Sequence, residues 1–213
     1  DPRRAPRREL TEAIVACQQQ IHDFSRAVHA GRIVSSTGQR FDKLLVIGIG
    51  GSALGPQLAA AALGSGADKL TPYFFDNTDP DGFDRVLDKL CRSGAGLATT
   101  LVLIVSKSGG TKETRNGMLI AQAAFAQARL PLARHAVAIT QDGSELHQAA
   151  TRSGFLAIFL MWDFVGGRTS ELSAVGLLPA ALQGLAIDEL LAGAKAMDEA
   201  TRQADPTQNP AML

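Results

Sequence analysis

Residues 43–53 read KLLVIGIGGSA, and this stretch decides the fold. Its aliphatic residues, 44–47, are not interrupted by a polar side chain, which is typical of a strand covered on both faces. Glycines follow at once, and after them comes a segment rich in Ala and Leu at residues 54–63. A buried strand that turns through glycines into a helix is the first unit of a parallel α/β sheet.

The same alternation continues along the chain. We expect strands at residues 43–48, 72–76, 100–106, 135–140 and 155–160, and helices between them at 54–63, 80–91, 111–128 and 144–153. An amphipathic helix at 9–30 and a hairpin or turn at 33–39 should precede this unit, and helices at 173–182 and 188–203 should follow it. The pattern predicts an α/β fold with a five-stranded, doubly wound parallel sheet of flavodoxin-like order 2-1-3-4-5, an N-terminal helix and C-terminal helices.

The composition argues against several classes of function. Lys+Arg and Asp+Glu both number 21, and this zero formal net charge gives no basic surface for nucleic acid or membrane. The longest apolar runs are far too short to span a bilayer. The four histidines have no metal-ligand spacing and the two cysteines make no disulfide framework, so we expect no metal site and a reducing, cytoplasmic location.

The glycine-rich turn after the first strand is suited to binding an anion. Its glycines let backbone N–H groups approach a ligand, and the N-terminus of the following helix adds its positive dipole. Read formally, residues 48–53 also fit the dinucleotide pattern G-x-G-x-x-A, and Asp76 ends the second strand where a ribose-binding acid would fall. A nicotinamide-dependent oxidoreductase is therefore one hypothesis.

A second anion cradle follows the third strand, where residues 106–111 read SKSGGT. Hydroxyls and backbone amides of this loop can ring a phosphate, and Lys107 can supply positive charge. In the order 2-1-3-4-5 the first and third strands are neighbours at the point where ligands bind, so the two loops should face each other. A single phosphate held from two strand ends suits a compact phosphosugar better than a dinucleotide.

A third loop, residues 163–170 with the sequence DFVGGRTS, follows the fifth strand. Its glycines would place Arg168 beyond the carboxyl edge of the sheet, where it can clamp an anion or stabilise negative charge on a substrate oxygen. The alternative is an ion pair between Arg168 and Glu171 or Asp163. Glu113 lies in the first turn of a predicted helix, where an acid complements the dipole, so we expect capping rather than catalysis from it.

Together these segments resemble the glucose-6-phosphate isomerase family of the sugar-isomerase (SIS) superfamily. The matching residues are 48–52 (GIGGS), 106–114 (SKSGGTKET) and 165–168 (VGGR), and residues 75–80 (FDNTDP) look like the branch found in cyanobacteria and related bacteria. The animal and plant branch carries Thr and Phe in the second loop, but Ser108 keeps a hydroxyl there. The resemblance runs from about Arg32 to the C-terminus.

The resemblance implies a reversible isomerisation between glucose 6-phosphate and fructose 6-phosphate, through an enediolate and without a cofactor, in glycolysis and gluconeogenesis. Arg168 would be the catalytic residue of this chain, near the first carbons of the sugar. The residues around the phosphate would be Gly51, Ser52, Ser106, Lys107, Ser108 and Thr111. In the family a glutamate base, a histidine and a lysine lie in motifs further toward the C-terminus, for which no match is found here. The full-length enzyme would be a homodimer.

The chain starts at Asp1 and stops shortly after Asn209-Pro210, a helix-opening pair, so we expect a piece of a longer polypeptide. The expected parts are a lead-in at residues 1–40, an SIS domain at 41–162, and the Arg168 loop with helices at 163–213 that lead toward a second SIS domain. Without the base, this piece should bind phosphosugar weakly and not turn it over. The alternative is a stand-alone regulatory SIS module that binds a phosphosugar.

Overall fold

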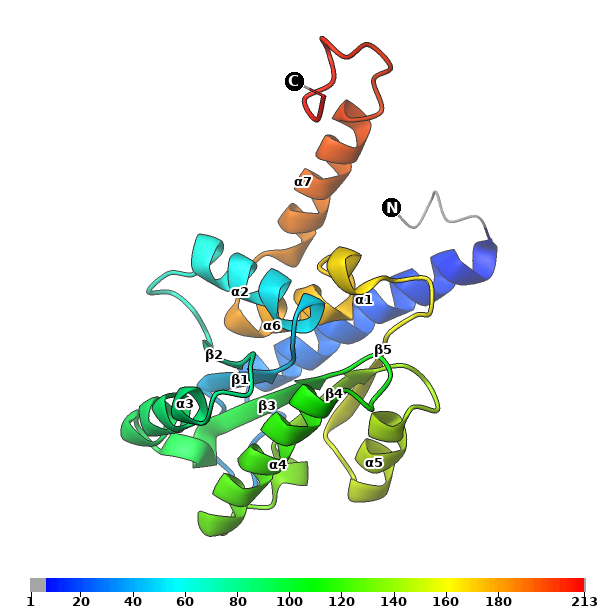
Figure 1. Ribbon diagram of the computed structural model, residues 1–213. Coiled ribbons are helices and arrows are strands. Elements are labelled where there is room, and N and C mark those ends of the chain that lie inside the picture. The colour runs from blue at the N-terminus through cyan, green and yellow to red at the C-terminus, as the bar shows by residue number, and fades with distance from the viewer. Residues whose placement is uncertain (1–6, 213) are drawn as a thin grey trace.

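Five parallel strands form one sheet, and they follow the aliphatic runs of the sequence (Figure 1). The computed structural model describes residues 7–212, so the first six residues of the expected lead-in lie outside it. The strands are β1 (Lys43–Ile47), β2 (Thr71–Phe75), β3 (Thr100–Val105), β4 (Ala136–Thr140) and β5 (Ala157–Leu160). Their order is β2-β1-β3-β4-β5 with every neighbouring pair parallel, which confirms the predicted topology.

Helices cover both faces of the sheet. Figure 1 shows α1, α2 and α6 on one face and α3, α4 and α5 on the other, while α7 extends away from the sheet. Their bounds are α1 (Arg8–His29), α2 (Gly51–Leu63), α3 (Pro80–Arg92), α4 (Lys112–Gln127), α5 (Glu145–Ser153), α6 (Ala174–Gln183) and α7 (Ile187–Ala200). Between α1 and β1 the chain forms a turn, closed by the Ser35 N–H and the Gln39 carbonyl, and not a hairpin. In the described range, no helix combines the length and the apolar character needed to cross a membrane.

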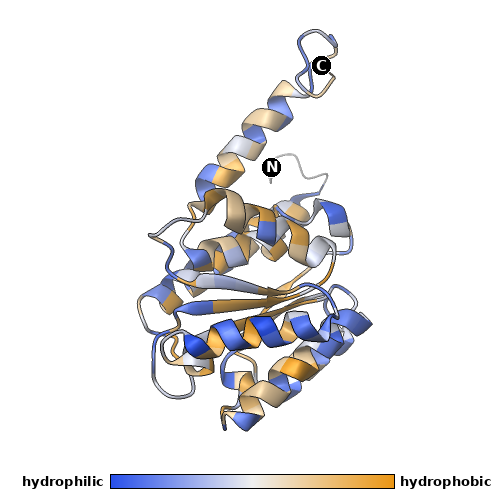
Figure 2. Ribbon diagram, turned by 60° about the vertical axis from the view of Figure 1, so that its left-hand side comes forward, coloured by the Kyte–Doolittle hydropathy of each residue, from blue (hydrophilic) through white to orange (hydrophobic). Residues whose placement is uncertain are grey.

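Each strand sends alternate side chains into two separate hydrophobic cores. Leu44 and Val46 face the core shared with α1 and α6, whereas Leu45 and Ile47 face the core under α3, α4 and α5. All residues of β1, β3 and β4 are buried, which is why these strands read as unbroken aliphatic runs. Figure 2 shows hydrophobic colouring along the strands in the middle of the molecule. Because α1 and α6 complete one of the cores, the lead-in and the C-terminal part pack with the sheet as one unit.

Helix α6 is buried over its entire length. All ten of its residues are buried and none of them is charged, and it packs against both α1 and α2. Ser173 caps its N-terminus by accepting a hydrogen bond from the Val175 N–H, and Gly184 ends it in the left-handed conformation. This helix therefore forms an uncharged layer between the sheet and α2.

The strand register brings the loops after β1 and β3 to the same edge. Ile47 lies beside Phe75 of β2 and beside Ile104 of β3. The Gly48 N–H donates to the carbonyl of Phe75, and the Ser106 N–H donates to the carbonyl of Ile139, so pairing continues to the point where each loop starts. Both predicted anion cradles therefore begin at the carboxyl edge of neighbouring strands.

The loop after β5 packs directly on the first turn of α2. A Cβ placed on Gly51 would overlap the carbonyl oxygen of Gly167, which belongs to a short 3-10 helix, η4 (Gly167–Thr169). The Ser170 hydroxyl lies 3.3 Å from the carbonyl oxygen of Gly51 and 2.9 Å from that of Gly167, and it can donate to either. The loops after β1 and β5 are thus in backbone contact.

A buried histidine fastens the turn between α1 and β1 to the sheet. His135 is fully buried, and its ring meets the rings of Phe41 and Phe125 edge-on. Its Nε2 lies 3.3 Å from the backbone nitrogen and 2.8 Å from the hydroxyl of Ser36, and its Nδ1 lies 3.0 Å from the carbonyl oxygen of Thr100. Because the Ser36 N–H can only donate, we assign the ring proton to Nδ1, where it bonds Thr100. Burial lowers the pKa of His135 below its usual 6.5.

We expect His135→Phe to lower the free energy of unfolding by about 1–3 kcal/mol at pH 7.5, because the half-buried Ser36 and the buried Thr100 lose a hydrogen-bond partner. Since the folded chain disfavours the charged ring, the unfolded wild type binds the extra proton first, and wild-type stability falls as the pH drops through the usual histidine pKa. The variant lacks this loss. Urea unfolding should therefore show that the difference in free energy of unfolding between the wild type and the variant decreases from pH 7.5 to pH 5. A difference that does not change with pH would contradict a buried, neutral His135.

We expect Gly51→Ala to lower the free energy of unfolding by about 1–3 kcal/mol, because the added methyl group forces two backbones apart. Gly66→Ala is the matched control, since a Cβ at Gly66 meets nothing within 4 Å. Thermal unfolding followed by circular dichroism would measure both variants. Equal midpoints for the two variants would show that the loops after β1 and β5 are not in direct contact.

Candidate functional site

The loop after β1 presents hydrogen-bond donors at the start of α2. Gly50 has φ +58°, a conformation that side chains disfavour, and it turns the chain into the helix. The Ser52 N–H donates to the carbonyl of Ile49 at 3.1 Å. Within the described residues, neither the Gly51 N–H nor the Ser52 hydroxyl forms a hydrogen bond. These two groups are the donors that this loop offers to an anion at a helix N-terminus.

The loop after β3 is ordered by its own hydroxyls. The buried Ser106 hydroxyl donates to the Thr111 hydroxyl at 3.2 Å and accepts from the Gly109 N–H at 3.1 Å. The more exposed Ser108 accepts from the Gly110 N–H at 3.3 Å. Thr111 stands at the N-cap of α4, yet its side chain makes no capping bond. The structure thus places Ser106 as a support inside the loop, while Ser108 is exposed and Thr111 is half-buried.

The end of β4 supports this second loop. The loop was predicted from the sequence, but this support was missed. The Thr140 hydroxyl donates to the carbonyl of Ser106 at 2.6 Å and lies 2.7 Å from the Ser144 hydroxyl. The Gln141 N–H donates to the carbonyl of Lys107 at 3.0 Å. A threonine that ends a strand gives no signal of this kind in a sequence, because its partner lies 34 residues away. Two adjacent carbonyl groups of the cradle are therefore fixed from the neighbouring strand.

Lys107 joins the second loop to the third. Its ammonium group donates to the carbonyl of Asp163 at 2.6 Å and to that of Val165 at 3.1 Å, and it lies 3.6 Å from the Asp163 carboxylate. The sequence suggested that this ammonium supplies charge to a phosphate. In the structure its hydrogen bonds go to the third loop, so its charge stays at the edge of the cradle while its side chain positions the loop that carries Arg168.

Arg168 lies across the first loop and has no acidic partner among residues 7–212. Two of its guanidinium nitrogens come within 3.1 and 3.3 Å of the place that a Cβ on Gly50 would take. The alternative interpretation was an ion pair with Glu171 or Asp163. Asp163 instead faces Lys107, and both carboxylate oxygens of Glu171 are buried without a hydrogen-bond partner. Among the described residues Arg168 forms no ion pair, so its charge is available to an anion at this edge.

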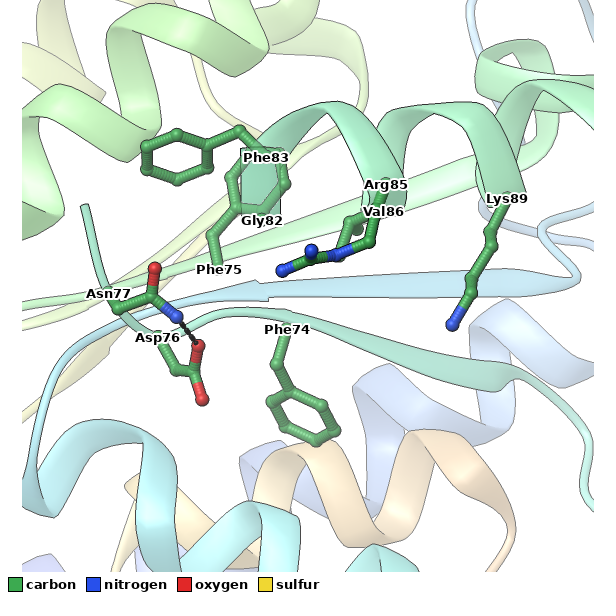
Figure 3. Close-up of a pocket in the computed structure, with 9 residues that line it drawn as sticks. All are labelled: Phe74, Phe75, Asp76, Asn77, Gly82, Phe83, Arg85, Val86 and Lys89. Atoms are coloured by element: carbon green, nitrogen blue, oxygen red, sulfur yellow. Dashed lines mark hydrogen bonds between the residues drawn. The ribbon is translucent and has the colours of Figure 1, made fainter. Parts of the chain in front are cut away.

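Asp76 is already engaged by neighbouring side chains. One of its oxygens accepts from the Gln57 amide at 2.6 Å and the other from the Asn77 amide at 2.7 Å, the second bond being drawn in Figure 3. Both carboxylate oxygens of Asp76 are therefore engaged within the fold, one by Gln57 of α2 and the other by the residue that follows Asp76. The pocket of about 190 Å³ beside it is lined from α3 by Arg85 and Lys89, whose side chains point toward β2 in Figure 3. Charged side chains of this kind protect an edge strand from pairing with another chain.

The remaining candidates lie apart from these loops or have simple structural roles. Glu113 occupies the first turn of α4, where its charge favours the helix dipole. The ring of Trp162 stacks on that of the exposed Phe164 at 5.6 Å. The described residues contain no group of three or more His, Cys, Asp or Glu that could hold a metal ion. The candidate site therefore consists of three loops that offer hydroxyls, backbone amides and an arginine that forms no ion pair with any described residue.

Known proteins match the whole chain. A family model described as phosphoglucose isomerase matches residues 6–213. The glucose-6-phosphate isomerase of Citrifermentans bemidjiense is 56% identical over 212 residues, and that of Thermosynechococcus vestitus is 58% identical over 213 residues. In both comparisons 100% of this chain is covered, but only 39% and 40% of the relatives. The chain thus spans about two fifths of their length.

Solved structures agree with the sequence comparison. The crystal structure of a glucose-6-phosphate isomerase from Chlamydia trachomatis aligns with a TM-score of 0.74 at 33% identity, covering 90% of this chain and 35% of its own. A hypothetical protein from Thermus thermophilus aligns with a TM-score of 0.73 at 33% identity, covering 92% of this chain and 44% of its own. Sequence and fold lead to one assignment, and the chain belongs to the phosphoglucose isomerase family.

Proposed function

We propose that this chain is the phosphosugar-binding part of a glucose-6-phosphate isomerase, which interconverts glucose 6-phosphate and fructose 6-phosphate through an enediolate. Family membership and the names of relatives more than 50% identical support the proposal. The single observation that carries it is Arg168, which has no acidic partner among the described residues and lies over a glycine loop, in a segment that Lys107 of the hydroxyl-rich loop bonds. No metal or organic cofactor is required for such an isomerisation.

The phosphate would be held between the first two loops. The Gly51 N–H and the Ser52 hydroxyl would donate from the start of α2, and the hydroxyls of Ser108 and Thr111 would donate from the start of α4. Both helices direct the positive ends of their dipoles to the same edge, which favours a dianionic group. Ser106 would keep the second loop in shape, and Lys107 would add positive charge from the side.

Arg168 would act on the carbon end of the sugar. The enediolate carries negative charge that the open-chain sugar lacks, so a fixed cation stabilises it more than it stabilises the substrate. The arginine is fixed before the substrate arrives, because Gly167 touches Gly51 and Lys107 bonds the carbonyl of Val165. An electrostatic contribution of this kind typically accelerates a reaction about 10²–10³-fold.

The proton transfer between C2 and C1 needs a base within hydrogen-bond reach of the substrate. Hydroxyls, backbone amides and an arginine cannot accept that proton near neutral pH, so we assign the base to the rest of the polypeptide, as a glutamate assisted by a histidine and a lysine. The division into residues 1–40, 41–162 and 163–213, with a second SIS domain to follow, belongs to the same proposal. So do a homodimer and a cytoplasmic location for the whole enzyme.

A phosphosugar should raise the melting temperature of this chain. We expect 6-phosphogluconate at one hundred times its Kd to add about 2.7 kcal/mol, which is several degrees for a domain of this size, while NAD should add nothing. The double variant Ser106→Ala/Thr111→Ala should lose the shift, because it removes the Thr111 hydroxyl that would donate to the phosphate and the Ser106 hydroxyl that keeps the loop in shape. Ser93→Ala, at the exposed C-cap of α3, should keep it. A shift with NAD alone would instead favour the oxidoreductase hypothesis.

The chain of 213 residues should show no isomerase activity by itself. A coupled assay that follows formation of glucose 6-phosphate from fructose 6-phosphate would test this. The fructose 6-phosphate concentration should be high enough to saturate the binding site of the chain. Any rate above background that Arg168→Ala removes would mean that a base is present in this chain.

A further inference from the structure

The strongest anomaly in the molecule is the side chain of Glu171. Both carboxylate oxygens are buried, and neither has a hydrogen-bond partner within the described residues. The residue lies between η4 and α6, and its carboxyl group fills space left by two glycines. A Cβ on Gly55 of α2 would overlap Oε2, and a Cβ on Gly176 of α6 would overlap the carboxyl group from the other side. Because buried polar groups are nearly always paired, an unpaired carboxyl group requires an explanation.

In the part of the chain that the structure describes, no charged group compensates the carboxyl group in this niche. The elements packed against it are α2, α6 and η4, and neither α2 nor α6 contains an ionisable side chain. The cation of η4 is Arg168, which lies over Gly50, and Asp163 of the same loop faces Lys107. Of the two histidines on α1, His29 bonds the carbonyl of Leu182 near the C-terminal end of α6, and His22 bonds Asp188. The niche between α2 and α6 therefore suits a neutral carboxylic acid and not a carboxylate.

Glu171 also belongs to the segment that carries Arg168. Gly167 touches Gly51, Ser170 bonds the Gly51 carbonyl, and Glu171 packs on Gly55 one turn further along α2. These contacts lie in series on one side of the helix. Of these contacts, only the one between Glu171 and Gly55 depends on a proton. Loss of this contact would loosen the segment that positions Arg168.

We infer that Glu171 is a positioning residue of the anion site: in its neutral form it holds residues 167–171 against α2, and on ionisation it leaves the niche and releases Arg168 from the first loop. The inference rests on the proposed function. Once outside the niche, the carboxylate lies three residues from Arg168 and would neutralise part of the charge that the anion needs. Binding of a phosphosugar should therefore weaken as the pH rises.

The carboxyl group of Glu171 should lose its proton near neutral pH, where binding would be measured. Burial raises the pKa of Glu171 from 4.5 to about 7. The folded chain keeps a proton that the unfolded chain releases between these two values, so the stability linked to this group is complete below pH 4.5 and is lost as the pH rises through 7. Glu171→Gln keeps the shape of the side chain but cannot ionise. The melting temperature of this variant should therefore increase relative to that of the wild type as the pH rises above 7.

A first experiment tests the niche. Gly55→Ala should lower the melting temperature of the wild type, because its methyl group expels the carboxyl group. In the background Glu171→Ala the same change should raise the melting temperature, because the space is empty and alanine favours a helix. Gly193→Ala in α7, where a Cβ meets nothing within 4 Å, is the control and should behave alike in both backgrounds. The inference would be overturned if Gly55→Ala changed the melting temperature by the same amount in the wild type and in Glu171→Ala.

The second experiment measures binding of 6-phosphogluconate by calorimetry at pH 6 and pH 8. If only the neutral form positions Arg168, wild-type affinity should fall roughly tenfold, in proportion to the neutral fraction, relative to Glu171→Gln. The comparison with Glu171→Gln cancels the titration of the phosphate, which is common to both proteins. Gly55→Ala should bind weakly at both pH values.

The outcomes separate the inference from the function beneath it. Parallel pH dependence in the wild type and in Glu171→Gln, with binding intact, would overturn the inference alone, even where the melting temperatures differ. An absence of binding by every variant at both pH values would overturn the proposed function and the inference with it.

Discussion

The backbone contact between Gly51 and Gly167 is the constraint on which the site depends. Gly51 opens the helix that follows β1, and Gly167 follows β5, which lies at the far edge of the sheet. The third loop must therefore pass over the ends of β4 and β3 to reach α2. Lys107, at the end of β3, bonds two carbonyl groups of that loop on its way. A side chain at Gly51 would push the loop away and take Arg168 with it.

Much of the fold could be predicted from the sequence because parallel strands are buried on both faces. The aliphatic runs at residues 44–47 and 101–105 could only be interior strands, and each of the glycine-rich loops that follow them opens a helix. Residue types also sufficed to pick out Arg168 and the three loops that follow β1, β3 and β5 as candidates for an anion site. These features depend on local composition, and the order of the sheet follows from the rules for connecting parallel strands.

The side-chain partners could not be predicted in the same way. Lys107 bonds carbonyl groups 56 and 58 residues away, and backbone carbonyls leave no mark in a sequence. The two partners suggested for Arg168 were the acids nearest to it along the chain, but one faces Lys107 and the other is buried. Proximity in sequence was a poor guide because η4 turns the intervening residues onto α2. The niche for Glu171 depends on glycines of two different helices, so only the packed structure reveals it.

The wholly buried helix α6 has a consequence for the order of folding. It covers the same face of the sheet as α1, and His29 of α1 bonds the carbonyl of Leu182 across 153 residues of chain. Contacts between such distant segments carry a high entropic cost of loop closure and slow the folding of a chain. Strands β1 to β4 and helices α3 to α5 can pack through contacts between segments that are closer in sequence. The face that carries α2 is completed only when α6 packs onto it. The Arg168 loop, which connects β5 to α6, should therefore reach its final position in the last stage of folding, together with the helix that fixes it.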